Sequence, residues 1–221
     1  MKKIYILLLI SIISLSSFAQ DDVTKGIQCA ALISFDQFYL SDKFGGEQID
    51  YRSSELFPET YFKGYQFGFI KRKKRWNQSQ LNLTYFPEFK RNYNEMKIGD
   101  TDWAPADKTV NLEIYMLDIS KIFKINLFMK MLYLNVGVGA GGGAFKWKSD
   151  VPEGEFFSFA GQVYPIGGLE FMFLRHFGFF ANFRYHYGIS EPVSKTVDGL
   201  KHQYQFDMEG REFKAGVNIY F

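Results

Sequence analysis

Five ionisable side chains occupy alternate positions within largely apolar runs of the sequence: Glu113, Glu170, Arg184, His186 and Lys214. Alternate residues of a β-strand point to opposite faces, so these side chains would lie on one face and their apolar neighbours on the other. Carboxylates and bases enclosed together pair with each other, because an unpaired buried charge destabilises a protein by on the order of several kcal/mol. We therefore expect a structural network of salt bridges in a barrel interior, with a proton or ion path and a catalytic site as the alternatives.

The nucleophiles and histidines do not form a recognisable catalytic motif. Ser190 follows His186 at a distance of four residues, but a Ser/His/acid site needs all three groups within hydrogen-bond distance, and no hydrolase motif is present. His176 and His202 are expected at opposite ends of the molecule, which argues against a three-histidine metal site. We expect no enzyme activity, no cofactor and no metal.

Two other motifs have structural explanations. Residues 137–142, Gly-Val-Gly-Ala-Gly-Gly, match a dinucleotide-binding pattern, yet no helix is expected to follow and bind a pyrophosphate. Their inward glycines would instead leave room for large opposing side chains or let the wall bend. Asp100, Asp102 and Asp107 could bind calcium, but their spacing is not that of a known loop, and we expect a disordered segment.

The basic run from Lys71 to Arg75 does not indicate a nucleic-acid partner. The chain has 26 basic and 24 acidic residues, and loss of Lys2 and Lys3 with a signal peptide would leave 24 of each. Such a balance does not favour binding to a polyanion. At a turn beside a membrane the run can contact anionic lipid head groups, with Trp76 as an interface anchor. A solvated turn is the alternative.

The N-terminus has the pattern of an export signal. A basic start, Met1-Lys2-Lys3, precedes an apolar stretch that ends in Ser17-Phe18-Ala19, which predicts cleavage after Ala19. A membrane anchor is the alternative, but the stretch is shorter than the roughly 20 residues needed and lacks a positive flank on its far side. We therefore expect a signal peptide at residues 1–19 and one outer-membrane barrel domain at residues 20–221. Cys29 is the only cysteine, so no internal disulfide is expected.

Apolar and polar residues alternate with the period of a β-strand in eight segments of the remaining chain. Even-numbered barrels of this kind begin at eight strands. The apolar sets expected to face outward are Ile27, Cys29, Ala31 and Ile33; Tyr65, Phe67 and Phe69; Leu81, Leu83 and Tyr85; Val110, Leu112, Ile114 and Met116; Phe128, Leu132, Leu134, Val136 and Val138; Val163, Leu169, Phe171 and Phe173; Phe179, Ala181, Phe183, Tyr185 and Tyr187; and Phe213, Ala215, Val217, Ile219 and Phe221.

The connections between these segments alternate in length, as they do in membrane barrels. The long ones are residues 36–60, 89–108, 145–157 and 190–209, and the short ones are residues 73–76, 121–127 and 174–178. The predicted fold is all-β: an eight-stranded antiparallel up-and-down transmembrane β-barrel with short periplasmic turns and long extracellular loops. A soluble barrel or β-sandwich is the alternative, but 19% aromatic residues suit a wall that faces lipid.

The C-terminus looks like the assembly signal of outer-membrane barrels. Lys214, Gly216, Ile219 and Phe221 give a polar residue, a glycine, a hydrophobic residue and a final aromatic, although Ile219 stands where an aromatic is usual. With the Ala19-Gln20 junction and the eight segments, the chain resembles small outer-membrane barrels of the OmpX and OmpA-domain type, and among Bacteroidota families the PorT-like barrels. The resemblance implies location in the cell outer membrane among lipids and lipopolysaccharide, and insertion by the barrel-assembly machinery.

The function expected from this fold is non-catalytic. An eight-stranded barrel has an interior just wide enough for side chains. We expect an integral outer-membrane protein that offers an external binding surface or serves as an accessory subunit of a secretion or uptake complex with another outer-membrane protein. A narrow ion or small-molecule transporter is the first alternative, and a lipid-modifying enzyme is the second.

Overall fold

The computed structural model describes residues 25–35, 37–44, 47–52, 61–74, 76–150, 153–173, 176–197 and 200–221. The expected signal peptide, residues 1–19, lies outside this part of the chain. Among the described residues, no helix is long and apolar enough to cross a membrane.

The described chain is almost entirely β-strand. The strands in chain order are β1 (Lys25–Ser34), β2 (Gln37–Phe44), β3 (Glu47–Arg52), β4 (Phe62–Lys74), β5 (Asn77–Ile98), β6 (Ala104–Phe128), β7 (Leu132–Asp150), β8 (Glu153–Phe173), β9 (Phe177–Ser190), β10 (Val193–Val197) and β11 (Leu200–Tyr220).

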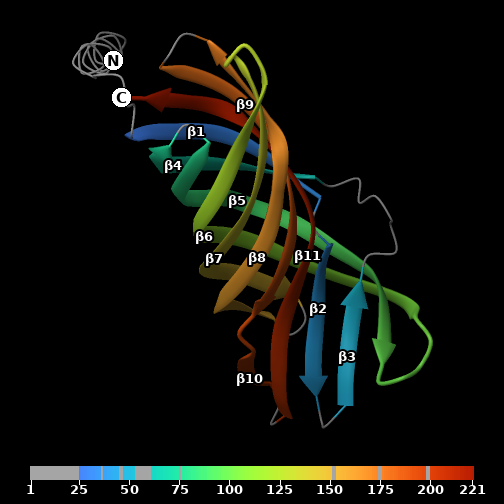
Figure 1. The fold of residues 1–221 in the computed structure, drawn as a ribbon. Coiled ribbons are helices and arrows are strands. Elements are labelled where there is room, and N and C mark those ends of the chain that lie inside the picture. The colour runs from blue at the N-terminus through green and yellow to red at the C-terminus, as the bar shows by residue number, and fades with distance from the viewer. Residues whose placement is uncertain are drawn as a thin grey trace.

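Eight of these strands close into a ring. β1, β4, β5, β6, β7, β8, β9 and β11 each pair antiparallel with the next, and β11 pairs back with β1. The predicted eight-stranded antiparallel up-and-down barrel is therefore confirmed. Its strands are tilted and strongly curved (Figure 1). Lys25 and Phe221 meet at one end through backbone hydrogen bonds; we call this the terminal end, and the opposite end, which carries β2, β3 and β10, the distal end.

The distal half of the barrel is built from interrupted strands. β2 pairs with β11 directly beyond β1, β3 pairs with β5 beyond β4, and β10 pairs with β11 beyond β9. Most residues of the predicted long loops therefore belong to strands, and β6 alone has 25 residues, whereas about 9–11 suffice to cross a bilayer. The barrel wall thus continues well beyond one membrane thickness.

Two predicted connections were wrong. The turn expected at residues 121–127 lies inside β6, and the actual turn comes at Phe128–Met131, where the Met131 amide donates to the Phe128 carbonyl. The segment with Asp100 and Asp102 was expected to be disordered. It instead forms a tight turn between β5 and β6, with Gly99 at positive φ and the Thr101 amide bonded to the Ile98 carbonyl.

The predicted orientation of one strand was also wrong. Val110, Leu112, Ile114 and Met116 of β6 point inward and are buried. They belong to an apolar core that fills the distal half, together with residues such as Phe145, Trp147, Phe156, Tyr204 and Phe206. Nearer the terminal end, β6 exposes Leu117 and Ile119 on its outer face instead. The apolar residues change face along one strand because the two halves of the wall have different surroundings.

Candidate functional site

A buried acid, Glu170 of β8, organises the polar interior near the terminal end. It forms an ion pair with Lys124 of β6 and accepts hydrogen bonds from Tyr220 Oη at 2.5 Å and Asn218 Nδ2 at 3.0 Å. The Arg72 guanidinium stacks over the Tyr220 ring at 3.5 Å and lies 4.0 Å from Glu170. These side chains come from four strands, so their contacts connect these strands across the barrel interior.

A second charged cluster lies halfway along the barrel around Arg184 of β9. Its Nε donates to Glu212 at 2.6 Å, and its Nη1 lies 3.8 Å from Asp118. Tyr164 Oη donates a hydrogen bond to the same Asp118 carboxylate. His186 bonds to Gln162 at 2.9 Å through Nδ1 and faces Glu212 at 3.3 Å through Nε2.

Lys214 is held by amides. Its ammonium donates to Gln66 Oε1 at 2.7 Å and to Gln28 Oε1 at 3.1 Å, and Gln66 in turn donates to Thr84 at 2.7 Å. All of these residues are buried. Of the expected assembly signal, Lys214, Gly216 and Ile219 lie on β11 with Lys214 inside, and Phe221 follows the end of that strand with its side chain exposed.

Four of the five ionisable residues singled out in the sequence lie inside the barrel: Glu170, Arg184, His186 and Lys214. The expectation for Glu113 must be corrected. Because β6 has the opposite orientation, Glu113 lies on the outer wall, where it accepts hydrogen bonds from Tyr85 Oη at 2.9 Å and Tyr115 Oη at 2.8 Å.

Six buried charges among the described residues escaped the sequence analysis: Asp42, Arg91 and Lys108 in the distal half, and Asp118, Lys124 and Glu212 nearer the terminal end. Glu212 lies two positions before Lys214 on the same face of β11, so the alternation of that strand contained the signal. Asp118 and Lys124 lie in the part of β6 that was expected to end or turn, and a strand carried through to Phe128 would have placed both inside.

An apolar plug closes the barrel on the distal side of these clusters. Trp147 stacks on Phe156 with ring centroids 4.0 Å apart, and Phe206 and Tyr204 meet the Trp147 ring edge-on at 5.0 and 5.3 Å. Between plug and charges lies a cavity of about 20 Å³ beside His186, Arg184 and Glu212, which has room for about one water molecule. Between the plug and the charged cluster, the described side chains therefore leave only this small space.

A buried lysine lies within the distal core. The Lys108 ammonium sits 4.3 Å from the ring centroid of Tyr51 and 5.1 Å from that of Tyr204. Burial lowers the pKa of Lys108 to about 8, and the Asp42 charge opposes this shift. Asp42 itself is buried and lies 3.1 Å from His202 Nδ1. Aromatic faces and one carboxylate therefore stabilise the cation in place of water.

The three histidines lie in three separate environments. His176 Nδ1 bonds to the Tyr220 carbonyl at the terminal end, His186 lies mid-barrel, and His202 pairs with Asp42 near the distal end. Ser190 Oγ accepts from the Phe206 amide at 2.8 Å and donates to the Glu191 carbonyl at 3.3 Å, so its hydroxyl is engaged with backbone. Within the described ranges, no three His, Cys, Asp or Glu side chains gather closely enough to hold a metal.

The glycine motif of β7 has a packing role. A Cβ on Gly139 would collide with the Tyr164 ring, and a Cβ on Gly137 would collide with the Lys121 carbonyl of the neighbouring strand. β7 continues as a strand beyond the motif, so no helix N-terminus is available for a pyrophosphate. Gly139 therefore makes room for the tyrosine that binds Asp118, and Gly137 allows close approach to the backbone of β6.

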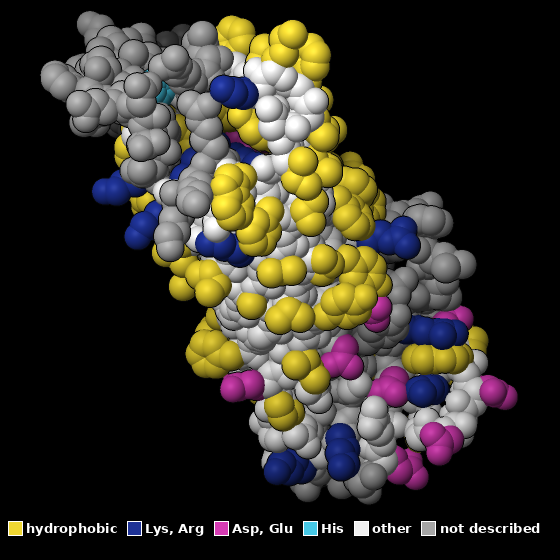
Figure 2. Space-filling model, in the orientation of Figure 1, with side chains coloured by type: hydrophobic (Ala, Val, Ile, Leu, Met, Phe, Trp, Pro, Cys, Tyr) yellow, Lys and Arg dark blue, Asp and Glu magenta, His cyan; other side chains and the backbone are white. Residues whose placement is uncertain are grey.

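The outer wall of the terminal half is a belt of exposed apolar side chains. Figure 2 shows hydrophobic residues spread over the body of the barrel, with Asp and Glu gathered toward the end that carries β2 and β3. A monomer in water rarely exposes so large a continuous apolar surface. The belt includes Phe67, Phe69, Leu81, Leu83, Leu117, Ile119, Val136, Val138, Val163, Leu169, Phe171, Phe179 and Phe213.

No protein-family model matches the sequence, and no curated protein matches it significantly. Several solved structures have a similar fold. Neisserial surface protein A is 13% identical, with 89% of this chain and 97% of that one covered and a TM-score of 0.49. OprG of Pseudomonas aeruginosa is 13% identical, with 89% and 95% covered and a TM-score of 0.47. Ail, the attachment invasion locus protein of Yersinia pestis, is 13% identical, with 85% and 99% covered and a TM-score of 0.39. At these values the strand pairing, not the similarity, establishes the fold.

Proposed function

We propose that this chain is an integral outer-membrane barrel that neither conducts nor catalyses, and that its distal half projects outside the cell as a binding surface. The apolar belt supports the membrane location, because exposed apolar side chains suit a lipid environment. The closed ring supports it as well, since it leaves no unpaired strand edge in lipid. Lys25, Phe221 and the short turns would then face the periplasm.

The filled interior is the observation that carries the non-conducting part of this proposal. Charged clusters around Glu170 and Arg184 occupy the terminal half, and the stacked rings around Trp147 occupy the distal half. A transporter of ions or small molecules would need a continuous path, and the cavity between the two regions is only about 20 Å³. The buried charges already have partners, which explains them without catalysis.

The distal tip supports the binding role. Trp103 is covered by the Arg52 guanidinium at 3.9 Å, and Arg52 pairs with Glu95 at 2.7 Å on the neighbouring strand. Lys97 pairs with Asp50 at 3.6 Å beside them. Aromatic residues and arginine are enriched at protein-binding surfaces, and Trp103 and Arg52 bring the two together at this tip. We propose that the partner is a second outer-membrane protein and that the chain has a PorT-like role in a secretion or uptake complex. This part of the proposal rests on the C-terminal sequence pattern alone.

Planar-bilayer recordings and membrane cross-linking test the proposal together. The purified protein should give no stepwise current under conditions in which a porin control does. In cross-linked membranes, Trp103→Ala should reduce recovery of the partner, whereas Tyr61→Ala on the outer wall should not. Reproducible current steps would contradict the sealed interior. A His186-dependent change in the acylation of membrane lipids would contradict the absence of catalysis.

A further inference from the structure

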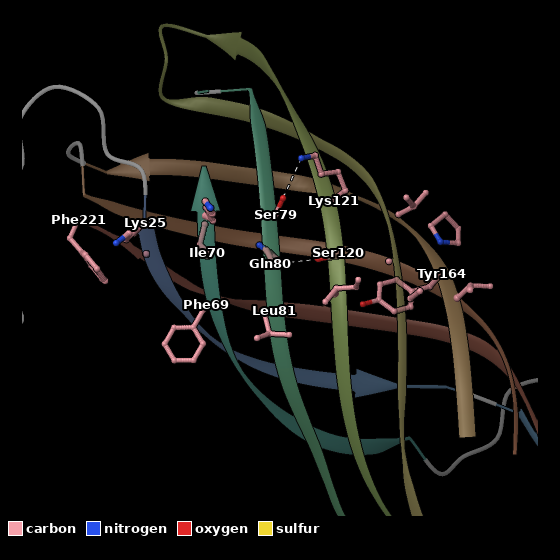
Figure 3. A pocket seen from close by; sticks show the side chains of 18 residues that line it. Lys25, Phe69, Ile70, Ser79, Gln80, Leu81, Ser120, Lys121, Tyr164 and Phe221 are labelled. Carbon is pink, nitrogen blue, oxygen red and sulfur yellow. Dashed lines mark hydrogen bonds between the residues drawn. The ribbon is translucent and has the colours of Figure 1, made fainter. Parts of the chain in front are cut away.

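A row of three lysines and one serine crosses four neighbouring strands on the outer wall of the terminal half. Lys25 of β1 pairs in register with Lys71 of β4, Lys71 with Ser79 of β5, and Ser79 with Lys121 of β6. All four side chains point away from the interior. Lys121 Nζ donates to Ser79 Oγ at 3.2 Å, so the ammonium leans along the row toward Lys71 (Figure 3).

An apolar hollow of about 1250 Å³ adjoins this row. Phe69, Leu81 and Ile119 flank it on three successive strands in the same register. Val138 and Val163 extend the apolar surface across β7 and β8. The exposed fraction of Ile119 and of Val138 is 63%, so this part of the lining faces the surroundings of the barrel, whereas Ile70, Gln80, Ser120 and Tyr164 of the same lining are buried. Figure 3 shows Phe69 and Leu81 on the neighbouring strands β4 and β5.

The place of Lys121 is unusual for a charge. It stands between Ile119 and Phe123 on the outer face of β6, seven residues before Phe128 at the end of the strand. The row to which it belongs lies near the terminal end, because Lys25 is the first residue of β1 and Lys71 lies three residues before the end of β4 at Lys74. An ammonium on a lipid-facing wall at this level needs an anion from the head-group region. No acidic side chain is among the described residues that line the hollow.

We propose that the row Lys25, Lys71, Ser79 and Lys121 binds the phosphate of an anionic phospholipid, whose acyl chains lie along the outward Phe69, Leu81 and Ile119. This inference rests on the proposed membrane location and adds a specific lipid site to it. The row supplies three positive charges and a hydroxyl, which complement a phosphate, and Phe69, Leu81 and Ile119 complement the chains. The site belongs to the terminal end, so the lipid comes from the periplasmic leaflet.

Native mass spectrometry on protein extracted from nanodiscs tests the site. The discs contain equal amounts of phosphatidylglycerol and phosphatidylethanolamine. Wild-type protein should retain phosphatidylglycerol preferentially, and Lys71→Ala with Lys121→Ala should lower its retention by about tenfold or more. Lys71→Arg with Lys121→Arg should keep it. The matched control, Lys63→Ala with Lys146→Ala, removes two outward lysines of the distal half and should leave retention unchanged.

Equal retention of both lipids by the wild type, or unchanged retention in the Lys71→Ala, Lys121→Ala variant, would overturn the lipid site while leaving the membrane location intact. A wild-type protein that does not enter nanodiscs would instead contradict the membrane location itself. Displacement of phosphatidylglycerol by inorganic phosphate alone would show that the acyl chains are not bound, and would also overturn the proposal.

Discussion

Arg184 has more charged partners than any other buried cation described above. It contacts Glu212 directly, approaches Asp118 and lies 4.7 Å over the Tyr164 ring. A cation removed from water in this way needs all of its partners, and the partners need it in turn. The cluster therefore stabilises the barrel only as a unit.

Arg184→Met should lower the free energy of unfolding by about 3–5 kcal/mol, because Glu212 and Asp118 would be left buried beside an apolar side chain. Adding Glu212→Gln to this variant should recover part of the loss, since one of the two unpaired charges disappears. Urea unfolding in detergent micelles measures both. A double variant less stable than Arg184→Met would show that the unpaired charge of Glu212 is not a main cost of the substitution.

Lys108 should make stability depend on pH in the alkaline range. Burial lowers its pKa to about 8 in the folded chain, whereas about 10.4 is usual in an unfolded one. Between these values the unfolded state binds the extra proton, so stability should rise with pH from about 8 toward 9.5. Lys108→Met should remove this rise, and Lys146→Met on the exposed outer wall should keep it. A slope that persists in Lys108→Met would refute the assignment.

The positions of single charges were predictable where the strand pattern was unambiguous. Glu170, Arg184 and Lys214 alternate with apolar neighbours that face outward, and all three lie inside. Glu113 alternates with Leu112, Ile114 and Met116, which are equally apolar but point into the distal core. Sequence alternation separates two faces without saying which of them is inside.

At the scale of the strand, β6 combines two opposite patterns. Its apolar residues occupy even positions up to Met116 and, apart from the buried Ile122, odd positions from Leu117 to Leu127, while the backbone keeps one orientation. The switch marks the level at which the inner face passes from an apolar core to polar clusters, and in the proposed membrane location it is also the level at which the outer face passes from water to lipid. A pattern of this kind, recognised in sequence, would have predicted both the orientation of the strand and the edge of the belt.

Two leucines on β6 test this assignment with one chemical change. Leu112 is fully buried and the exposed fraction of Leu117 is 55%. Leu112→Ala should cost about 2–5 kcal/mol of unfolding free energy through the cavity it leaves, and Leu117→Ala should cost much less. The comparison uses urea titration of the refolded protein in micelles. A larger loss for Leu117→Ala would mean that β6 has the orientation first predicted from sequence.

The β6–β7 turn shows why one connection escaped prediction. Met129 and Lys130 both have positive φ, at 44° and 59°, as the two central residues of a tight hairpin turn require. Asn and Gly are the usual residues there, and neither is present. The sequence therefore contains no turn signal at this place. For this reason the turn was expected too early, at residue 121, although β6 continues to Phe128.

At the scale of the whole molecule, closure and strand number were predictable and the height of the wall was not. The eight predicted segments have regular alternation and belong to the eight strands of the observed ring. The distal strands β2, β3 and β10 are short, interrupted and less regular in sequence. They are held by pairing with long neighbours, which is a non-local interaction that local patterns do not contain.

The orientation of the barrel in the membrane is the central claim, and labelling of intact cells tests it most directly. In a Cys29→Ser background, a cysteine is placed at Asp102 in the distal turn or at Met129 in the terminal turn, and each is treated with a maleimide too bulky to cross the outer membrane. We predict that Asp102→Cys is labelled on intact cells and that Met129→Cys is labelled only after the outer membrane is permeabilised. Labelling of Met129→Cys on intact cells, or of neither position before permeabilisation, would contradict the account.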